Sequence, residues 1–417
     1  MLTRRSLLVL STGGVVTALV GACAQQPRQT ISVADFGSRG DGVHDDTDAF
    51  RRALDAARLA GNTTVRVPAS PAGYVVRHLT IPSGVTLAGD RSRPALLASG
   101  QTPLWIALSG SGVVLSDLTL RTRGVVSAAG VRIGQGSDGV SLRNVSLEAP
   151  GDRPPLALVD VGGSTRNVTL DGCTLVGGSN GFRLIGAADG ITLTANHFAG
   201  WRDRAIWFAG THDGAPRSVR VDNNTVRPHA PGGRVRQPIQ FTGFDSRPTV
   251  DVAVTNNRVT GPGTDYLDPL RPGSADLISL HHCSDFRVTG NLAQGGGEVG
   301  ITVAQQCSDG VIEDNTCVSN GSCGIAVGSA TSRWVRNVQV LDNRVVGNGV
   351  RGRGDRTPDW ARAGIVVEKA TGVTLSGNRS GNPATGTPQL YGITIRDADP
   401  RLERNVLTGN LLAEVQR

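Results

Sequence analysis

Short stretches of this chain alternate apolar with polar residues, and one phrase returns about a dozen times. Examples are NVTLDGCTL at 167–175, SVRVDNNTV at 218–226 and NVQVLDNRV at 337–345. Each places apolar residues two apart, then a polar corner, then a fixed position that is usually Asn. These positions fall 23–35 residues apart, at Asp90, Leu118, Val145, Cys173, Asn196, Asn224, Asn257, Asn291, Asn315, Asn343, Asn378 and Asn405. The alternation predicts short strands. A strand repeat of this length predicts an all-β solenoid of about twelve coils over residues 62–417.

Residues 31–61 precede the repeats and have a different pattern. A strand is expected first, followed by an α-helix over 46–60 that Asp46 or Thr47 would cap. The helix would cover the open end of the solenoid core. Its acidic residues are therefore interpreted as structural rather than catalytic or calcium-binding. Its apolar stripe has helical spacing and consists of Ala49, Phe50, Ala53, Leu54 and Ala57.

The N-terminus predicts export. TRRSLL at 3–8 is a twin-arginine pattern, and the apolar run from Leu7 to Leu19 is too short to span a membrane. We interpret residues 1–22 as a signal peptide, VGAC as a lipidation signal ending at Cys23, and residues 23–30 as a tether. An ordinary cleaved signal with an accidental cysteine is the alternative. The protein is expected as a lipid-anchored monomer at the outer face of the cytoplasmic membrane or the cell surface, where nucleic acid is not an expected partner.

Composition adds one constraint on the chemistry. The chain has 417 residues, a formal net charge of +7 and a single lysine, Lys369, so arginine supplies nearly all of the positive charge. Arginine cannot act as a base at ordinary pH, but it binds carboxylates, sulfates and phosphates through two parallel hydrogen bonds. An acidic polymer is therefore a permitted partner.

The segments VADFGSRGDGVHDDTDAFRRALDAA at 33–57 and VRVPASPAGYVVRHLTIPSGVTLAGD at 65–90 resemble the start of pectate-lyase-like and polygalacturonase-like proteins. The resemblance implies a single-stranded right-handed parallel β-helix. It does not fix the reaction, because lyases, hydrolases, epimerases and phage tailspikes share this fold.

A second strand phrase lies upstream of the fixed position in most coils, as in GFRLIG at 181–186 and LISLHH at 277–282. Alternation predicts that the third and fifth residues of each phrase face outward. Stacked coils then form one long face, which is most polar from Arg183 to Thr302. Two long insertions at 227–237 and 260–276 would lie beside it. The outward residues are Arg132, Arg183, Trp207, Gln240, Ser279, His281, Thr302, Ala326 and Val366.

The resemblance also implies catalytic carboxylates just before these strands. Asp276 precedes LISL, and Glu298 precedes GITV on the next coil. Two acids on adjacent coils would suit an inverting glycoside hydrolase. Cys323 and Val366 stand where the polygalacturonase pattern has His and Arg. The expected activity is hydrolysis of a polysaccharide, with an acidic polymer favoured.

A lyase or C5-epimerase acting on uronates is a second interpretation. Arg183 or Arg204 would hold the sugar carboxylate, His281 would be the base, and Tyr266 would donate a proton. No cofactor is required, although Ca²⁺ could bind Asp265, Asp268 and Asp276 in a lyase. The other substrate-binding candidates are Trp207, Gln240, Ser279, Thr302 and Gln305.

A lipid-anchored glycan-binding or wall-structural protein without catalysis is a third interpretation. The cysteines supply one further expectation. Cys283 and Cys307 each lie eight residues before a fixed position, so they should stack on adjacent coils about 4.8 Å apart. This spacing and the exported setting predict a disulfide between them.

Overall fold

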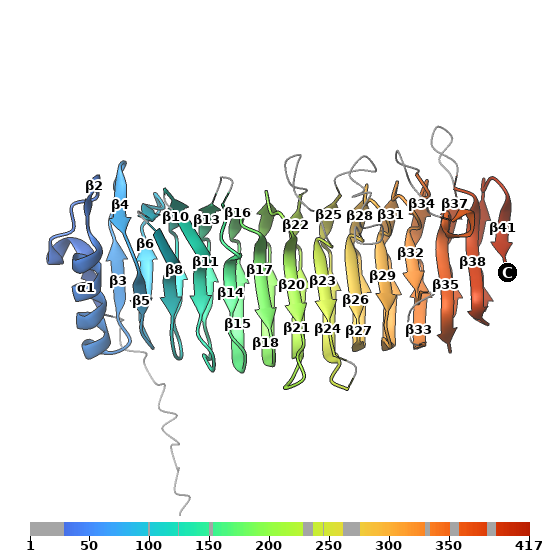
Figure 1. Ribbon diagram of the computed structural model, residues 1–417, viewed down its shortest axis with the longest axis horizontal. Helices are drawn as coiled ribbons and strands as arrows, with labels where there is room; N and C mark the ends of the chain where they lie inside the picture. Colours follow the sequence, from blue (N-terminus) through green and yellow to red (C-terminus); the bar gives the residue numbers. More distant parts are fainter. Residues whose placement is uncertain are drawn as a thin grey trace, which may run out of the picture.

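The computed structural model describes residues 29–98, 101–123, 125–149, 153–227, 237–244, 246–261, 276–329, 334–350, 358–381 and 389–417. These residues form one elongated parallel β-helix with the strands of successive coils side by side (Figure 1). The expected signal peptide and Cys23 lie outside the described residues. Within the described ranges, no helix is long and apolar enough to cross a membrane.

Three strands make up most coils, and equivalent strands of successive coils pair in parallel to form three stacks. The first and second stacks join into a 27-stranded sheet, and the third forms a 14-stranded sheet. The first stack contains β5 (Leu79–Ile81), β8 (Gln101–Leu108), β11 (Val125–Ile133), β14 (Ala157–Val161), β17 (Asn180–Ile185), β20 (Arg204–Ala209), β23 (Ile239–Thr242), β26 (Ile278–His281), β29 (Ile301–Ala304), β32 (Ile325–Val327), β35 (Ala363–Thr371), β38 (Tyr391–Ala398) and β41 (Ala413–Gln416).

The second stack follows the first along each coil. It contains β1 (Thr30–Ser32), β3 (Thr64–Val67), β6 (Thr86–Gly89), β9 (Val114–Ser116), β12 (Ser141–Arg143), β15 (Thr165–Asp171), β18 (Ala188–Thr194), β21 (Pro216–Asp222), β24 (Thr249–Thr255), β27 (Cys283–Thr289), β30 (Ser308–Glu313), β33 (Val335–Leu341), β36 (Thr374–Ser376) and β39 (Arg401–Glu403).

The third stack contains β2 (Asp41–Asp45), β4 (Gly73–Val76), β7 (Ala95–Ala98), β10 (Thr119–Thr122), β13 (Ser146–Ala149), β16 (Thr174–Gly177), β19 (His197–Ala199), β22 (Thr225–Val226), β25 (Arg258–Thr260), β28 (Leu292–Gln294), β31 (Thr316–Val318), β34 (Arg344–Val346), β37 (Arg379–Gly381) and β40 (Val406–Thr408). The expected solenoid of about twelve coils is confirmed.

The core runs along the axis of the helix and is filled by the inward residues of all three stacks. In the first stack, Phe182, Phe208 and Phe241 stack with ring centroids 5.2 and 4.8 Å apart. All three are fully buried. Because successive side chains of a strand point to opposite faces, the residues that alternate with the inward ones on each strand face outward.

The predicted asparagine column is confirmed, and it lies inside. From Asn196 to Asn378 these asparagines are at most 1% exposed. Each side-chain amide donates to the Oδ1 of the next, through Asn405, at 2.9–3.0 Å. The same Oδ1 also accepts a backbone N–H at 2.9–3.0 Å. Polar corners inside the coil thereby gain the partners that buried groups need. A shorter second column, Asn320 to Asn348 at 2.9 Å, was not expected from the sequence.

The N-terminal end is closed by α1 (Thr47–Ala60), as the sequence predicts, with the 3₁₀ helix η1 (Val33–Phe36) beside it. The apolar stripe of α1 is buried against the first coils. The expected caps were wrong. Asp45 rather than Asp46 or Thr47 accepts the first free N–H, that of Thr47, at 3.1 Å. Asp46 instead accepts the backbone N–H groups of Arg39 and Gly40 at 2.7 and 3.0 Å.

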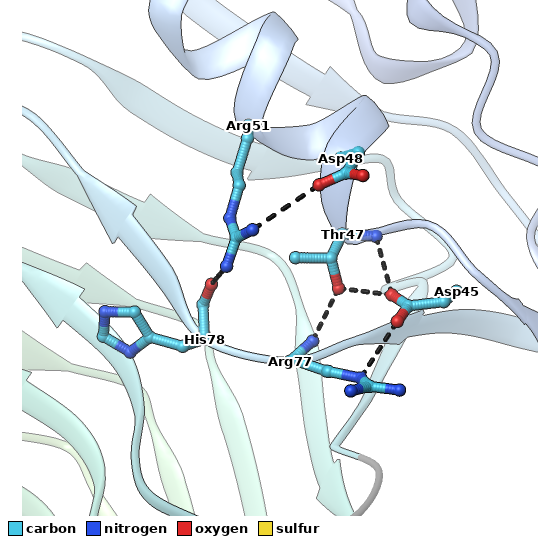
Figure 2. Close-up of polar contacts among 6 residues, drawn as sticks. All are labelled: Asp45, Thr47, Asp48, Arg51, Arg77 and His78. Carbon is cyan, nitrogen blue, oxygen red and sulfur yellow. Dashed lines mark hydrogen bonds and ion pairs between the residues drawn. The ribbon is translucent and has the colours of Figure 1, made fainter.

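Figure 2 shows how the start of α1 is tied to the chain after β4. The Arg77 guanidinium pairs with Asp45 at 2.9 Å, and the Arg77 N–H donates to the Thr47 hydroxyl at 2.9 Å. Arg51 donates to the carbonyl of His78 at 3.1 Å. These acids therefore hold backbone and helix in place, in agreement with their structural interpretation.

The predicted disulfide is not formed. Cys283 and Cys307 lie on adjacent coils as expected, but both are free, buried thiols, and the Cys283 N–H donates to Cys307 Sγ at 3.2 Å. In-register neighbours of stacked strands lie about 4.8 Å apart, a Cα separation that a disulfide can span. Stacking alone therefore does not decide whether the two thiols join.

Candidate functional site

The outward residues of the first stack form a continuous column, which confirms the register expected from the sequence. We call Arg132, Asp160, Arg183, Trp207, Gln240, Ser279 and Thr302 the central column; each is the in-register partner of the next. Asp160 was missed from the sequence, although its strand ALVDV carries the same alternation. The column continues to Ala326 and Val366 on the C-terminal coils.

A second column lies three residues earlier along the chain in each of these coils. We call Asn180, Arg204, Gln237, Asp276 and Val299 the flanking column. Asn180 and Arg204 pair in register, and the Leu277 N–H donates to the Val299 carbonyl at 2.9 Å, which continues the alignment across the later coils. All except Val299 are buried. The two columns together bring most of the expected site residues onto one surface.

Asp276 is a buried carboxyl in this surface. It is 8% exposed and accepts the Val299 N–H at 3.3 Å. Burial raises the pKa of Asp276 to about 6, although the nearby Thr302 hydroxyl and the Val299 N–H favour its charged form. The Thr302 hydroxyl does not reach hydrogen-bonding geometry. Asp276 is thus a carboxylic acid that retains its proton to about pH 6.

Glu298, the expected partner of Asp276, is half-buried on the next coil. Val299, not Glu298, is the residue aligned with Asp276, so Glu298 stands one position out of the flanking column. Asp276 and Glu298 both act on Cys323. The pKa of that thiol is raised well above its usual value, first by burial and then by Asp276 and, more weakly, Glu298. The joint catalytic role of Asp276 and Glu298 stays a prediction.

His281 ends β26, and its Nε2 lies 3.2 Å from the Ser279 hydroxyl oxygen. Burial, and secondarily the neighbouring His282, lowers the pKa of His281 to about 4. The imidazole is consequently neutral at pH 7 and a weaker base than a solvated histidine. Its in-register neighbours, Thr242 and Ala304, carry no charge.

Arg204, an expected carboxylate ligand, is engaged by other side chains of the protein. Its side chain is 8% exposed and pairs with Asp203 at 2.5 Å. It also donates to Gln240 Oε1, and its guanidinium lies 4.3 Å from the centre of the Trp207 ring. The charge is therefore neutralised inside the protein, and one face of Trp207 is covered. Arg204 supports Trp207 and Gln240 and is poorly available to a sugar carboxylate.

Three polar atoms on the two columns are buried without a hydrogen-bond partner. They are Asn180 Oδ1, Trp207 Nε1 and Thr302 Oγ1. An unpaired buried polar atom costs about 1–3 kcal/mol, so native proteins keep few of them. Asn180 was not among the expected site residues, and its place at the start of the phrase NGFRLI gave no signal.

Two other expected residues fall elsewhere. Gln305 follows β29 in a corner, where its carbonyl accepts the His282 N–H at 3.0 Å, so it belongs to neither column. Tyr266, Asp265 and Asp268 lie outside the described residues. Among the residues that are described, no group of three His, Cys, Asp or Glu side chains is placed to hold a metal ion.

Beyond Thr302 the same face becomes apolar. Cys323, Ala326, Ala363 and Val366 form a small buried cluster outside the main core. Trp360, in the 3₁₀ helix η3 (Asp359–Ala361), packs against this cluster together with Val299 and Tyr391. A charged pair returns farther along, where the buried Glu368 on β35 pairs with Arg396 on β38 at 3.3 Å.

Comparisons with known proteins agree with this architecture. A family model described as a right-handed β-helix region matches residues 184–380, and one described as rhamnogalacturonase A/epimerase, pectate lyase-like matches residues 30–200. The resemblance to pectate-lyase-like right-handed parallel β-helix proteins is thereby confirmed.

Individual proteins are similar to this chain either over a short segment or at low sequence identity. Alginate lyase 7 of Azotobacter vinelandii is 57% identical over 37 residues, which is 9% of this chain and 4% of that protein. The catalytic unit of a GH87 α-1,3-glucanase from Streptomyces thermodiastaticus has a TM-score of 0.66 at 17% identity, over 94% of this chain and 71% of that one. PfbA, a surface adhesin of Streptococcus pneumoniae, has a TM-score of 0.53 at 15% identity, over 90% and 89% of the two chains. The two structures share the fold, and one is an enzyme while the other is an adhesin.

Proposed function

We propose that this protein hydrolyses glycosidic bonds of a polysaccharide, with Asp276 as the general acid. The observation that carries the proposal is the buried Asp276 carboxyl, whose pKa is raised to about 6. A general acid must hold its proton near the working pH and release it in the transition state. Glycoside hydrolases obtain this property by placing a carboxyl in a poorly solvated site.

The surroundings of Asp276 suit a sugar polymer. Trp207 offers an indole N–H without a partner, Thr302 offers an unpaired hydroxyl, and Gln240 and Ser279 lie between them. Hydroxyl groups of a bound sugar would complete these hydrogen bonds. Stacked coils repeat every 4.8 Å or so, so a polymer lying along the helix axis would meet a new outward side chain at each coil.

In the proposed reaction Asp276 gives its proton to the glycosidic oxygen as the bond to the leaving sugar breaks. Glu298 takes a proton from the water that attacks the anomeric carbon from the opposite side. An inverting reaction of this kind needs two carboxyl groups far enough apart to admit that water. The neutral Ser279–His281 pair would orient sugar hydroxyls. The expected export signal and Cys23 lipidation would place the reaction outside the cytoplasmic membrane.

The lyase or epimerase interpretation is less well supported by the described residues. Its base, His281, has a pKa lowered to about 4. Arg204, one of its two carboxylate ligands, is engaged by Asp203 and Gln240. A binding protein without catalysis would use the same unpaired polar atoms, and activity assays separate it from the enzyme.

The test compares wild type with Asp276→Asn on a panel of neutral glucans, polygalacturonate and alginate. We expect new reducing ends without ultraviolet absorbance from an unsaturated product, and a loss of about 100-fold or more in kcat for Asp276→Asn. Asp189→Asn is the matched control, because Asp189 is a partly exposed carboxylate on the second stack that only weakly pairs with Arg217, at 3.9 Å.

Full activity in a folded Asp276→Asn variant would remove Asp276 from the mechanism. Unsaturated product would instead identify a lyase, and inversion at C5 without chain cleavage, detected by NMR, would identify an epimerase. Polymer binding without any conversion would identify a binding protein.

A further inference from the structure

The N-terminal end of the central column carries a three-residue charge cluster. Asp160 on β14 lies between Arg132 on β11 and Arg183 on β17, as their in-register neighbour on both sides. One carboxylate oxygen of Asp160 pairs with Arg132, and the other accepts Arg183 Nε at 2.9 Å. Both oxygens of the single carboxylate are thus occupied by arginine.

The cluster has one positive charge in excess. Asp160 is 5% exposed, whereas the side chains of Arg132 and Arg183 are 44% and 19% exposed. Asp160 is the sole carboxylate within ion-pair distance of either guanidinium in the described part of the chain. A guanidinium has five N–H donors in a planar fork. Each of these two arginines uses one toward Asp160, so most donors of both remain for another acceptor.

Arg204 lies in the flanking column on β20, one coil after Arg183, and makes a useful contrast. It has a carboxylate of its own in Asp203, and it is almost fully buried. Its charge is satisfied by the protein, and its role is to support Trp207. The Arg132–Asp160–Arg183 cluster is different because two arginines share one acid and both remain partly open to solvent.

We propose that the Arg132–Asp160–Arg183 cluster binds an anionic substituent of the polymer, either the carboxylate of a uronate or a sulfate ester. This inference rests on the proposed function, since it places the same chain across the Asp276 site. Arginine forks match both anions through parallel hydrogen bonds. Asp160 is a positioning residue that holds both guanidinium groups through its two carboxylate oxygens and lowers the net charge of the cluster to one.

The register of the strands sets the distance between the charge cluster and the Asp276 site. Arg183 and Ser279 are separated by three coil steps, through Trp207 and Gln240, which corresponds to about 14 Å. The anion would therefore be recognised several sugar units away from the bond near Asp276. Trp207, whose indole N–H lacks a partner, lies between the two places and would contact the intervening sugar.

The experiment measures binding in an Asp276→Asn background, so that no ligand is consumed. Calorimetry compares three matched hexasaccharides. One is built of galacturonate, one is its carboxyl-reduced form built of galactose, and one is a sulfated form of that galactose hexasaccharide. We expect at least one charged form to bind about tenfold or more tightly than the neutral form, with an advantage that shrinks as salt is added. Preference for the first or the second charged form identifies the carboxylate or the sulfate as the natural anion.

Arg132→Gln should remove most of that advantage, because it deletes the more exposed fork and leaves the Asp160–Arg183 pair intact. Arg121→Gln is the control. Arg121 is similarly exposed and pairs with Glu148 at 2.8 Å, but it lies on the third stack. Melting temperatures of both variants verify that each is folded.

Equal binding of all three hexasaccharides would overturn the inference, as would an Arg132→Gln effect no larger than that of Arg121→Gln. These outcomes leave the proposed hydrolysis intact if a neutral polymer is cleaved by wild type. Charge-dependent binding through Arg132 without cleavage of any polymer would instead refute the hydrolysis and retain the anion site.

Discussion

Two columns of polar residues run along this helix, one inside the coils and one outside. In the inner column, Asn224, Asn257 and Asn291 donate to and accept from their neighbours at 2.9–3.0 Å. The outer column is the central column of the first stack. Its members Trp207 and Thr302 are also aligned in register, yet each holds a buried polar atom without a partner.

This difference in hydrogen bonding distinguishes the two columns where burial does not. Ser279 and Thr302 are as buried as many core residues, so exposure alone would assign them to the scaffold. A stack whose hydrogen bonds are complete stabilises the coil and has nothing left for a ligand. A stack with unpaired atoms costs stability, and the cost is regained when a ligand supplies the missing partners.

The largest expected effect concerns the ionisation of Asp276. Its folded-state pKa of about 6 exceeds the usual 3.8, so the folded protein holds the proton more tightly than the unfolded chain does. This cost is absent below about pH 4 and grows as pH rises to about 6, reaching up to about 3 kcal/mol. Asn cannot ionise, so Asp276→Asn should melt above wild type at pH 7 and with it at pH 4.

The same ionisation sets the activity profile. The kcat/KM of wild type should fall as pH rises through about 6, because the acid loses its proton. A melting difference that does not change between pH 4 and pH 7 would show that Asp276 titrates normally, and the acid assignment would lose its main support.

The inner column should respond through stability alone. Asn257→Leu leaves Asn224 without its acceptor and the Val221 carbonyl without its donor, so unfolding should become easier by about 1–3 kcal/mol. Asn256→Gly is the control, since Asn256 is exposed, has a φ of 54° that glycine adopts freely, and its side-chain amide donates to Asp222 in the neighbouring corner. A lowered melting temperature in the first variant and little change in the second would confirm the distinction. Equal losses would show that the inner amides are no more important than surface ones.

The sequence predicted the periodic part of the fold well, because each coil repeats the same constraint. The inner asparagines, the helix over 46–60 and the outward register all follow from side-chain alternation. It could not predict which outward residues bond one another. Arg204 was expected to meet a substrate, and only the structure brings Asp203, Gln240 and Trp207 around it. The repeat also aligns Cys283 with Cys307 on adjacent coils, but it does not give the orientation of the two thiols, which are free in the structure.

The smallest expected effect tests the outer column most directly. Thr302→Val keeps the shape of the side chain and deletes a hydroxyl that has no partner within the protein, so stability should change by no more than about 0.5 kcal/mol. Thr255→Val is the matched variant on the second stack, because the Thr255 hydroxyl donates to Asp222 at 2.6 Å and its loss should cost about 1 kcal/mol. Binding of the polymer should show the reverse order, weakened by Thr302→Val and unaffected by Thr255→Val. If Thr302→Val destabilises the protein as much as Thr255→Val and leaves binding unchanged, the Thr302 hydroxyl serves the scaffold, and the outer column is structural like the inner one.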